Sequence, residues 1–93
     1  MFEKLKLAQI FKVFAKNSDE FNMRKTSEEL QELSLILTQQ LNKPHKDFSN
    51  HIIEEIAHVE IRLLYLKDKY CNKKIKEQVN KKIKKLNKNV NNR

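Results

Sequence analysis

The sequence predicts an all-α protein, an antiparallel bundle of about four helices that is completed by oligomerisation. The 93 residues include no glycine and one proline, so the tight turns that join β-strands are nearly absent. Apolar residues recur at intervals of three and four in successive segments, which is typical of one face of a helix. A chain of this length forms a single domain, 1–93, and its core is thin unless copies associate.

The first helix is expected within residues 1–16, followed by Asn17-Ser18-Asp19. These three polar residues interrupt the apolar pattern and supply a cap for the next helix. The apolar residues of the first helix are Phe2, Leu7, Ile10, Phe11 and Phe14. Lys12 and Lys16 interrupt this face, and no A-x-A-like cleavage site follows, so the segment is an amphipathic helix and not a signal peptide.

The middle of the chain, 20–70, is predicted to form a helical hairpin. Its two helices cover about 20–42 and 48–70, and the loop between them contains Pro44. Asp47 or Ser49 is a candidate cap for the second of these helices. The apolar residues of the hairpin helices are Leu30, Leu33, Leu37 and Leu41, and Ile52, Ile56, Val59, Leu63 and Leu66. A short loop makes the two helices antiparallel neighbours.

The last segment, 73–93, is a basic helix that ends near residue 90 and continues as a short tail. Its apolar face consists of Ile75, Val79, Ile83, Leu86 and Val90. Residues 1–71 contain eleven basic and eleven acidic side chains, whereas residues 72–93 contain nine basic side chains and one glutamate. This asymmetry indicates a polyanionic partner, either nucleic acid or the phosphates of a nucleotide. No motif for reading bases is present, so nucleic acid is the less favoured partner.

The cysteine content and the apolar runs point to a cytoplasmic location. The single cysteine, Cys71, excludes a disulfide within the chain and fits a reducing compartment. No apolar run approaches the roughly 18 residues of a membrane span, so a membrane partner is not expected.

Acidic residues and one histidine flank the apolar positions of the hairpin. Glu29 and Glu32 are three residues apart on one helix, with Glu28 four residues before Glu32, and Glu55 and His58 repeat the three-residue spacing on the other. If the hairpin packs through its apolar residues, the two pairs face each other. Carboxylates brought together repel one another and shift toward protonation unless a divalent cation binds. Oxygen ligands of this kind suit Mg²⁺ or Mn²⁺, and such sites usually act on phosphates.

A solvated helix surface is the alternative interpretation of the same residues. Glutamates on a lysine-rich helix commonly form ion pairs with a neighbouring turn, and Lys25 with Glu29 is one such pair. His51 and Arg62 lie on the same side of the helix as Glu55 and His58, and are expected at its wetter edge.

The strings SEELQEL and IIEEIAHVEI resemble the all-α nucleoside triphosphate pyrophosphohydrolases of the MazG type. That family has the pattern E-E-x-x-E, then one to three dozen residues, then E-x-x-D. Glu28, Glu29 and Glu32 match the first half, and Glu55 matches the start of the second half. The resemblance covers roughly residues 22–90 and departs from the pattern at His58, where the family has aspartate.

The resemblance implies metal-dependent hydrolysis of a nucleoside triphosphate to a monophosphate and pyrophosphate, in a helical bundle built from at least two copies. It implies a Mg²⁺ site made by Glu29, Glu32, Glu55 and the residue at position 58. One glutamate, Glu28 or Glu32, would orient or deprotonate the attacking water. Lys82 and Lys85 would neutralise substrate phosphates, in a homodimer or homotetramer.

His58 leaves three alternatives open. Imidazole is a softer ligand than a carboxylate, so the site uses Mn²⁺ or another divalent metal, keeps Mg²⁺ on three carboxylates with reduced affinity, or has lost catalysis. In the last case His58 pairs with Glu54 or Glu55, and the protein binds a nucleotide or a protein partner without turning it over. A basic helical module that binds nucleic acid through its last helix is the remaining rival.

Overall fold

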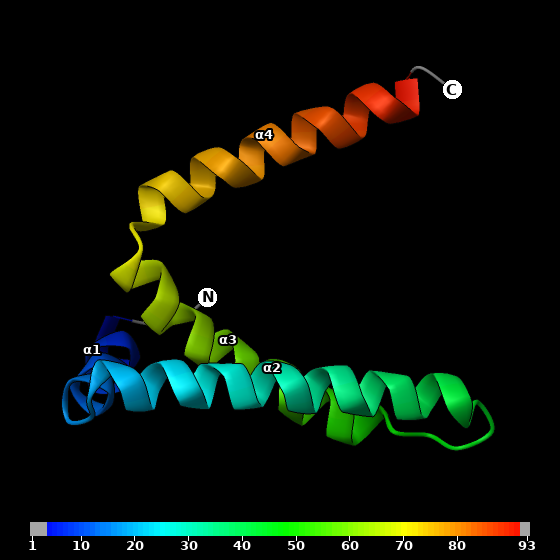
Figure 1. Ribbon diagram of the computed structural model, residues 1–93, viewed down its shortest axis with the longest axis horizontal. Helices are drawn as coiled ribbons and strands as arrows, with labels where there is room; N and C mark the ends of the chain where they lie inside the picture. Colours follow the sequence, from blue (N-terminus) through cyan, green and yellow to red (C-terminus); the bar gives the residue numbers. More distant parts are fainter. Residues whose placement is uncertain (1–3, 92–93) are drawn as a thin grey trace.

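The computed structural model describes residues 4–91, which form four α-helices and, within that range, no strand (Figure 1). The helices are α1 (Lys4–Ala15), α2 (Asp19–Asn42), α3 (Ser49–Lys69) and α4 (Asn72–Asn91). The predicted all-α class and the four helical segments are therefore confirmed. Phe2 and the end of the predicted tail lie outside the described residues.

Helices α2 and α3 form the predicted antiparallel hairpin. The Ser18 hydroxyl accepts a hydrogen bond of 3.1 Å from the backbone N–H of Phe21, so the predicted cap of α2 is present. At the start of α3 the N-cap residue is Phe48, so neither Asp47 nor Ser49 is the cap as predicted, although the Asp47 carboxylate accepts from the backbone N–H of Ser49 at 2.9 Å. Both contacts satisfy N–H groups that a helix start leaves without an intrahelical partner.

The loop between α2 and α3 is held by the side chain of Gln40. Its amide nitrogen donates to the carbonyl of Lys46 at 2.6 Å, and its amide oxygen accepts from the backbone N–H of Phe48 at 3.0 Å. One side chain therefore ties the end of α2 to both the loop and the start of α3.

Helix α1 is attached to the hairpin by an aromatic contact and a buried amide. The Phe14 ring is buried and lies edge-on to Tyr65, with 5.5 Å between the ring centroids. The side chain of Asn22 is 1% exposed and donates to the Phe14 carbonyl at 2.9 Å. Arg62 on α3 donates to the Asn22 side-chain oxygen at 3.3 Å, so one amide joins three helices.

The face of α2 that packs against α3 differs from its apolar stripe. Asn22, Thr26 and Ile36 are the buried residues of α2, whereas Leu30 and Leu37 are about two-fifths exposed. Helical spacing places Met23, Leu30, Leu37 and Leu41, all exposed, on one side of α2, beside the contact with α3. We call these four residues the α2 apolar face. On α3 the pattern is closer to expectation, because Val59 is buried, although Ile56 is exposed.

Helix α4 does not pack along the hairpin but leaves it, so that α2 and α4 form the arms of an open V (Figure 1). The junction is Tyr70 and Cys71, and Cys71 has a φ of 70°. This left-handed conformation is uncommon for a residue with a Cβ atom. The antiparallel four-helix bundle is thus not formed within one chain. None of the four described helices combines the length and the apolar character that a membrane-spanning helix needs.

We expect Asn22→Ala to lower the free energy of unfolding by about 1–3 kcal/mol, because the Phe14 carbonyl and Arg62 lose a buried partner. Chemical denaturation followed by circular dichroism measures this change. Gln31→Ala is the matched control, since Gln31 is exposed on the other side of α2, and it should change stability by about 0.5 kcal/mol or less. Equal effects of the two substitutions would contradict the anchoring role of Asn22.

Candidate metal centre

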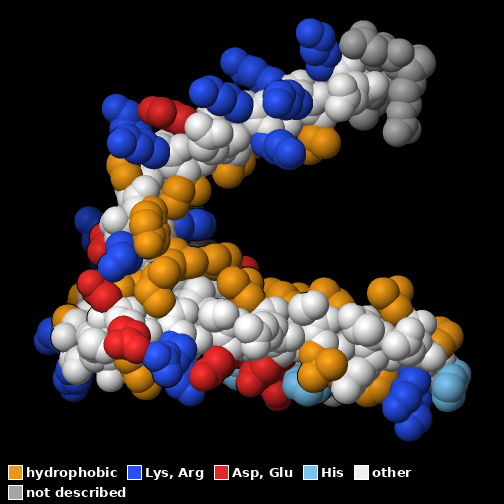
Figure 2. All heavy atoms as spheres, viewed as in Figure 1, with side chains coloured by type: hydrophobic (Ala, Val, Ile, Leu, Met, Phe, Trp, Pro, Cys, Tyr) orange, Lys and Arg blue, Asp and Glu red, His pale blue; other side chains and the backbone are white. Residues whose placement is uncertain are grey.

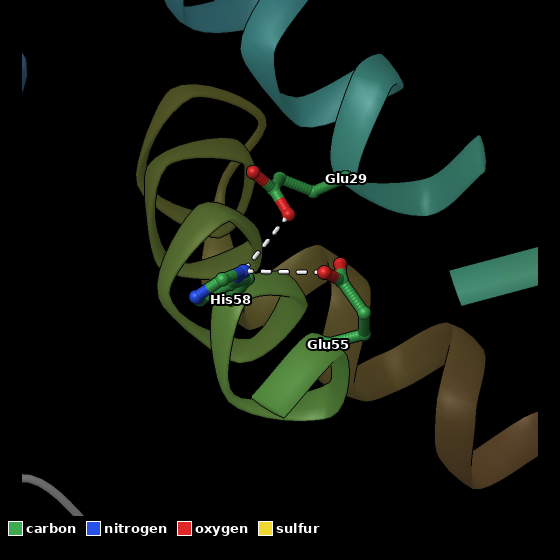
Figure 3. Close-up of side chains that lie close together, drawn as sticks. All are labelled: Glu29, Glu55 and His58. Atoms are coloured by element: carbon green, nitrogen blue, oxygen red, sulfur yellow. Dashed lines mark hydrogen bonds and ion pairs between the residues drawn. The ribbon is translucent and has the colours of Figure 1, made fainter. Parts of the chain in front are cut away.

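Three ionisable side chains meet where α2 and α3 pack together: Glu29 from α2, and Glu55 and His58 from α3 (Figure 3). One ligand atom from each lies within 4.8 Å of the others. Nδ1 of His58 is 3.2 Å from Oε2 of Glu29 and 3.6 Å from Oε1 of Glu55. We call these three residues the Glu–Glu–His cluster. The expectation that the polar residues of the two helices face each other is confirmed for this trio.

Glu55 is the buried member of the cluster. Its side chain is 7% exposed, and its Oε2 atom has no hydrogen-bond partner among the described residues. Burial raises the pKa of Glu55 above the usual range, and the nearby carboxylates of Glu29 and Glu32 raise it further, while His58 opposes the rise. The predicted repulsion between carboxylates is therefore present at Glu55.

His58 lies at the rim of the cluster, with about half of its side chain exposed. An N–H at Nδ1 donates to the Glu29 carboxylate, and a second imidazole, His51, has its Nε2 atom 3.8 Å from Oε1 of Glu55. In the same position an Nδ1 lone pair would face both carboxylates, because both lie on that side of the ring (Figure 3). Glu54, the other residue considered as a partner for His58, is exposed.

The cluster fits a small divalent cation. Two ligand atoms about 2.1 Å from one ion, at 90–110° to each other, are separated by about 3.0–3.4 Å. The His58–Glu29 and His58–Glu55 separations of 3.2 and 3.6 Å require little rearrangement. The unpartnered Oε2 of Glu55 gives one further oxygen. Two carboxylates with one imidazole form a mixed donor set that suits Mn²⁺, Fe²⁺ or Zn²⁺ at least as well as Mg²⁺.

The two remaining glutamates of the predicted motif lie differently. Glu32 is exposed, and it lines a hollow of about 330 Å³ with Ile36 and His51, beside the buried Glu55. Its carboxylate is close enough to raise the pKa of Glu55 but is not one of the three clustered ligands. Glu28 is exposed and pairs with Lys25 at 3.2 Å. The expected pair of Lys25 with Glu29 is replaced by this one, because Glu29 faces α3.

Lys82 and Lys85 are not brought to the cluster. Both are exposed on α4, which extends away from the hairpin (Figure 1). Lys82 instead lines an open groove with Tyr70 and Val79 where α3 and α4 meet. Within one chain, these two lysines therefore lie apart from the carboxylates that they were expected to serve.

Arg62 is the cation that the hairpin does place beside the cluster. It lines a shallow cavity of about 180 Å³ together with Glu29, His58 and Ile61. Its guanidinium donates to Asn22 and lies 5.8 Å from the Phe14 ring centroid. The expectation that Arg62 lies at the wetter edge of the helix is wrong, because these contacts pack it between α1 and α2. Its position four residues after His58 was the only signal of this role in the sequence.

The raised pKa of Glu55 predicts a pH-dependent stability of the metal-free protein. A carboxyl whose pKa is higher in the folded state binds more protons there than in the unfolded chain, so its contribution falls as pH rises from about 4.3 through the folded pKa. We therefore expect Glu55→Gln to raise the free energy of unfolding at pH 7, and the gain to vanish near pH 4. Denaturant titrations across this range, with Glu54→Gln as the exposed control, measure it. A gain that is independent of pH would contradict the electrostatic explanation.

No protein-family model, curated protein or solved structure matches the chain. The resemblance to the MazG type therefore rests on the acidic motif itself. The geometry of the Glu–Glu–His cluster is the structural observation from which a function can be argued.

Proposed function

We propose that the protein hydrolyses a nucleoside triphosphate to a monophosphate and pyrophosphate, with a divalent metal held by the Glu–Glu–His cluster. The observation that carries the proposal is the buried Glu55 carboxyl, whose Oε2 atom has no hydrogen-bond partner among residues 4–91, while Glu29 and His58 lie beside it. Leaving a buried polar atom without a partner is costly, and ionisable groups whose pKa is shifted by burial and by neighbouring charges cluster at functional sites. The resemblance of the acidic motif to that of the MazG type, which departs from it at His58, supplies the reaction class.

Each residue of the site has a role that its position supports. Glu29, Glu55 and His58 would hold the metal, and Glu32 is near enough to serve as a further ligand or as the base that orients water. A metal in such a site stabilises charge on phosphate oxygens and lowers the pKa of bound water. The carboxylate that serves as the base would take a proton from the attacking water, and the hydroxyl would add to the α-phosphorus. The bond between the α-phosphorus and the bridging oxygen would break, and pyrophosphate would leave with that oxygen. Glu28 is a weaker candidate for the base because it pairs with Lys25 on the exposed surface.

Arg62 is the residue best placed to bind a substrate phosphate. It lines the same shallow cavity as Glu29 and His58, and its guanidinium has five N–H groups, of which the contact with Asn22 uses one. Planar guanidinium groups bind phosphate oxygens well. Lys82 and Lys85 would take part only if association of copies brought an α4 to the cluster. We also propose that the protein acts as a homodimer or homotetramer, which would complete the bundle.

A second candidate is a protein of the same fold that binds a nucleotide or a protein partner without catalysis. The position of His58 favours it, since a protonated imidazole between Glu29 and Glu55 would itself compensate their charge. A cation supplied by the chain would then replace the metal.

Metal binding is the first test of the cluster. Mn²⁺ at 100 times its dissociation constant should raise the free energy of unfolding by about 2.7 kcal/mol. Glu55→Gln should abolish this rise, and Glu54→Gln should retain it. His58→Ala should weaken Mn²⁺ more than Mg²⁺, because imidazole is the softer ligand. Calorimetric titration of the metal-free protein measures each affinity, and equal binding by the Glu55→Gln variant would place any metal elsewhere.

Activity is tested by pyrophosphate release from a panel of ribo- and deoxyribonucleoside triphosphates, with Mg²⁺ and Mn²⁺ in parallel. We expect release with a matching monophosphate, and a loss of at least about 100-fold in kcat/KM for Glu29→Gln and Glu55→Gln. Arg62→Lys should raise KM more than it lowers kcat, because a lysine keeps the charge but not the planar fork.

The same assay separates the two candidates. An inactive but folded parent, combined with activity in His58→Asp, would identify a binding protein that becomes catalytic when position 58 carries the aspartate of the MazG-type pattern. Inactivity of both would sink the hydrolase proposal. Glu28→Gln tests which glutamate is the base. A loss of kcat/KM as large as that of Glu32→Gln would show that Glu28 takes part in catalysis.

A further inference from the structure

The surface of the chain is larger than a folded monomer of this size should have. Its accessible area is 8068 Å², whereas a compact protein of 11.2 kDa exposes about 5,700 Å². The radius of gyration is 16.6 Å, against about 12 Å for a compact chain of 93 residues. About 2,400 Å² per chain is therefore exposed beyond expectation.

Exposed hydrophobic side chains line the open V (Figure 2). Hydrophobic side chains gather on the side of the hairpin that faces α4 and on the side of α4 that faces the hairpin (Figure 2). On α4 they are Ile75, Val79, Ile83 and Leu86, which helical spacing places on one side and which we call the α4 apolar face. The last three are each about half exposed, and α4 has no buried residue among those described. On the hairpin, the exposed hydrophobic side chains include the α2 apolar face and, on α3, Ile53 and Ile56. Helical spacing places the α2 apolar face on the other side of α2 from Glu28 and Glu32.

The charges of the two arms are complementary. The hairpin, residues 19–69, contains ten acidic and seven basic side chains, whereas residues 72–91 contain eight lysines and one glutamate. Two α4 helices packed on each other would bring these lysines together, which is unfavourable. An α4 packed on a hairpin meets the opposite net charge. At 1.5 Å per residue, the α2 apolar face spans about 27 Å and the α4 apolar face about 17 Å, so the whole α4 apolar face fits within the length of the α2 apolar face.

We propose that a second copy of this chain occupies the V, with the α4 apolar face of each copy packed on the α2 apolar face of the other. The chain cannot fill its own V in the observed conformation, because the two-residue junction at Tyr70 and Cys71 holds α4 away from the hairpin. Two copies that each buried the excess area would bury about 4,700 Å² in total, within the range of obligate dimers. Reciprocal packing of this kind gives a closed two-fold pair.

This arrangement would be the structure of the homodimer named under the proposed function, and it does not depend on the chemistry of the Glu–Glu–His cluster. Acidic and histidine side chains gather on the side of the hairpin away from α4, opposite the hydrophobic side chains that line the V (Figure 2). The proposed interface therefore leaves that side free. Substitutions in the interface should alter the oligomeric state and leave Mn²⁺ binding by the monomer measurable.

Sedimentation velocity and light scattering on the full chain test the proposal. The parent should have twice the 11.2 kDa chain mass at micromolar concentration. Val79→Gln with Ile83→Gln on α4, and Leu30→Gln with Leu37→Gln on α2, should each weaken the dimer at least about 100-fold. Lys81→Gln with Lys84→Gln, on the other side of α4, is the matched control and should leave the dimer intact. All of these side chains are exposed or half-exposed in one chain, and circular dichroism checks that the variants remain helical.

Several outcomes would overturn the proposal. A monomeric parent would do so. In that case α4 closes on its own hairpin, or the V binds another partner, which co-sedimentation with anionic vesicles or with duplex DNA would reveal. Dissociation by the α4 pair but not by the α2 pair would show that α4 packs on α4. A second measurement does not depend on weakening the fold: in a Cys71→Ser background, chains carrying Leu37→Cys and Ile83→Cys are mixed and treated with a short bismaleimide. A link between the two different chains supports the proposal, and either no link or links only between Ile83→Cys chains would contradict it.

Discussion

The antiparallel contact between α2 and α3 is the interaction on which the rest of the structure depends. Helix α3 packs on the side of α2 that carries Asn22, Thr26 and Ile36, which is next to the leucine-rich side and not on it. This small rotation has two consequences. It brings Glu29 to face Glu55 and His58, and it leaves the leucines uncovered on the other flank. One helix contact thus produces both a cluster of ligands and a surface for association.

The contact between α2 and α3 buries an ionisable side chain within a very small hydrophobic core. Only four hydrophobic side chains of the described residues are buried, Phe14, Ile36, Val59 and Tyr65, and the carboxyl of Glu55 is buried next to them. A carboxyl in this position opposes folding at neutral pH, since burial and neighbouring carboxylates both favour its protonated form. Proteins tolerate local costs of this kind mainly at functional sites, where the same arrangement binds a ligand. The buried amide of Asn22, by contrast, has its hydrogen bonds satisfied and acts as a structural anchor.

Much of the fold and part of the site could be predicted from the sequence. Apolar periodicity and the cap at Ser18 predicted four helices with boundaries close to those observed. The three-residue spacing placed Glu55 and His58 on one side of α3, where Glu29 of α2 meets them. Periodicity could not show which side of an amphipathic helix meets its neighbour within the same chain. The exposure of Leu37 and the departure of α4 were therefore not foreseen. The position of Arg62 was predicted wrongly for a related reason. Its partners are the side-chain amide of Asn22 and the ring of Phe14, which are about 40 or more residues away in the sequence.

The left-handed backbone at Cys71 affects the equilibrium between a closed monomer and a dimer that exchanges α4. An α4 folded back on its own hairpin and an α4 exchanged with a second copy would make the same kinds of contact, and the two forms differ mainly at the junction between α3 and α4. A positive φ costs about 1–2 kcal/mol for a residue with a Cβ atom, and the chain has no glycine to adopt it freely. The backbone dihedral angles of one exposed residue, Cys71, therefore affect whether α4 is exchanged between two copies. A change there would shift the balance between closed monomer and exchanged dimer without touching either the carboxylates or the leucines.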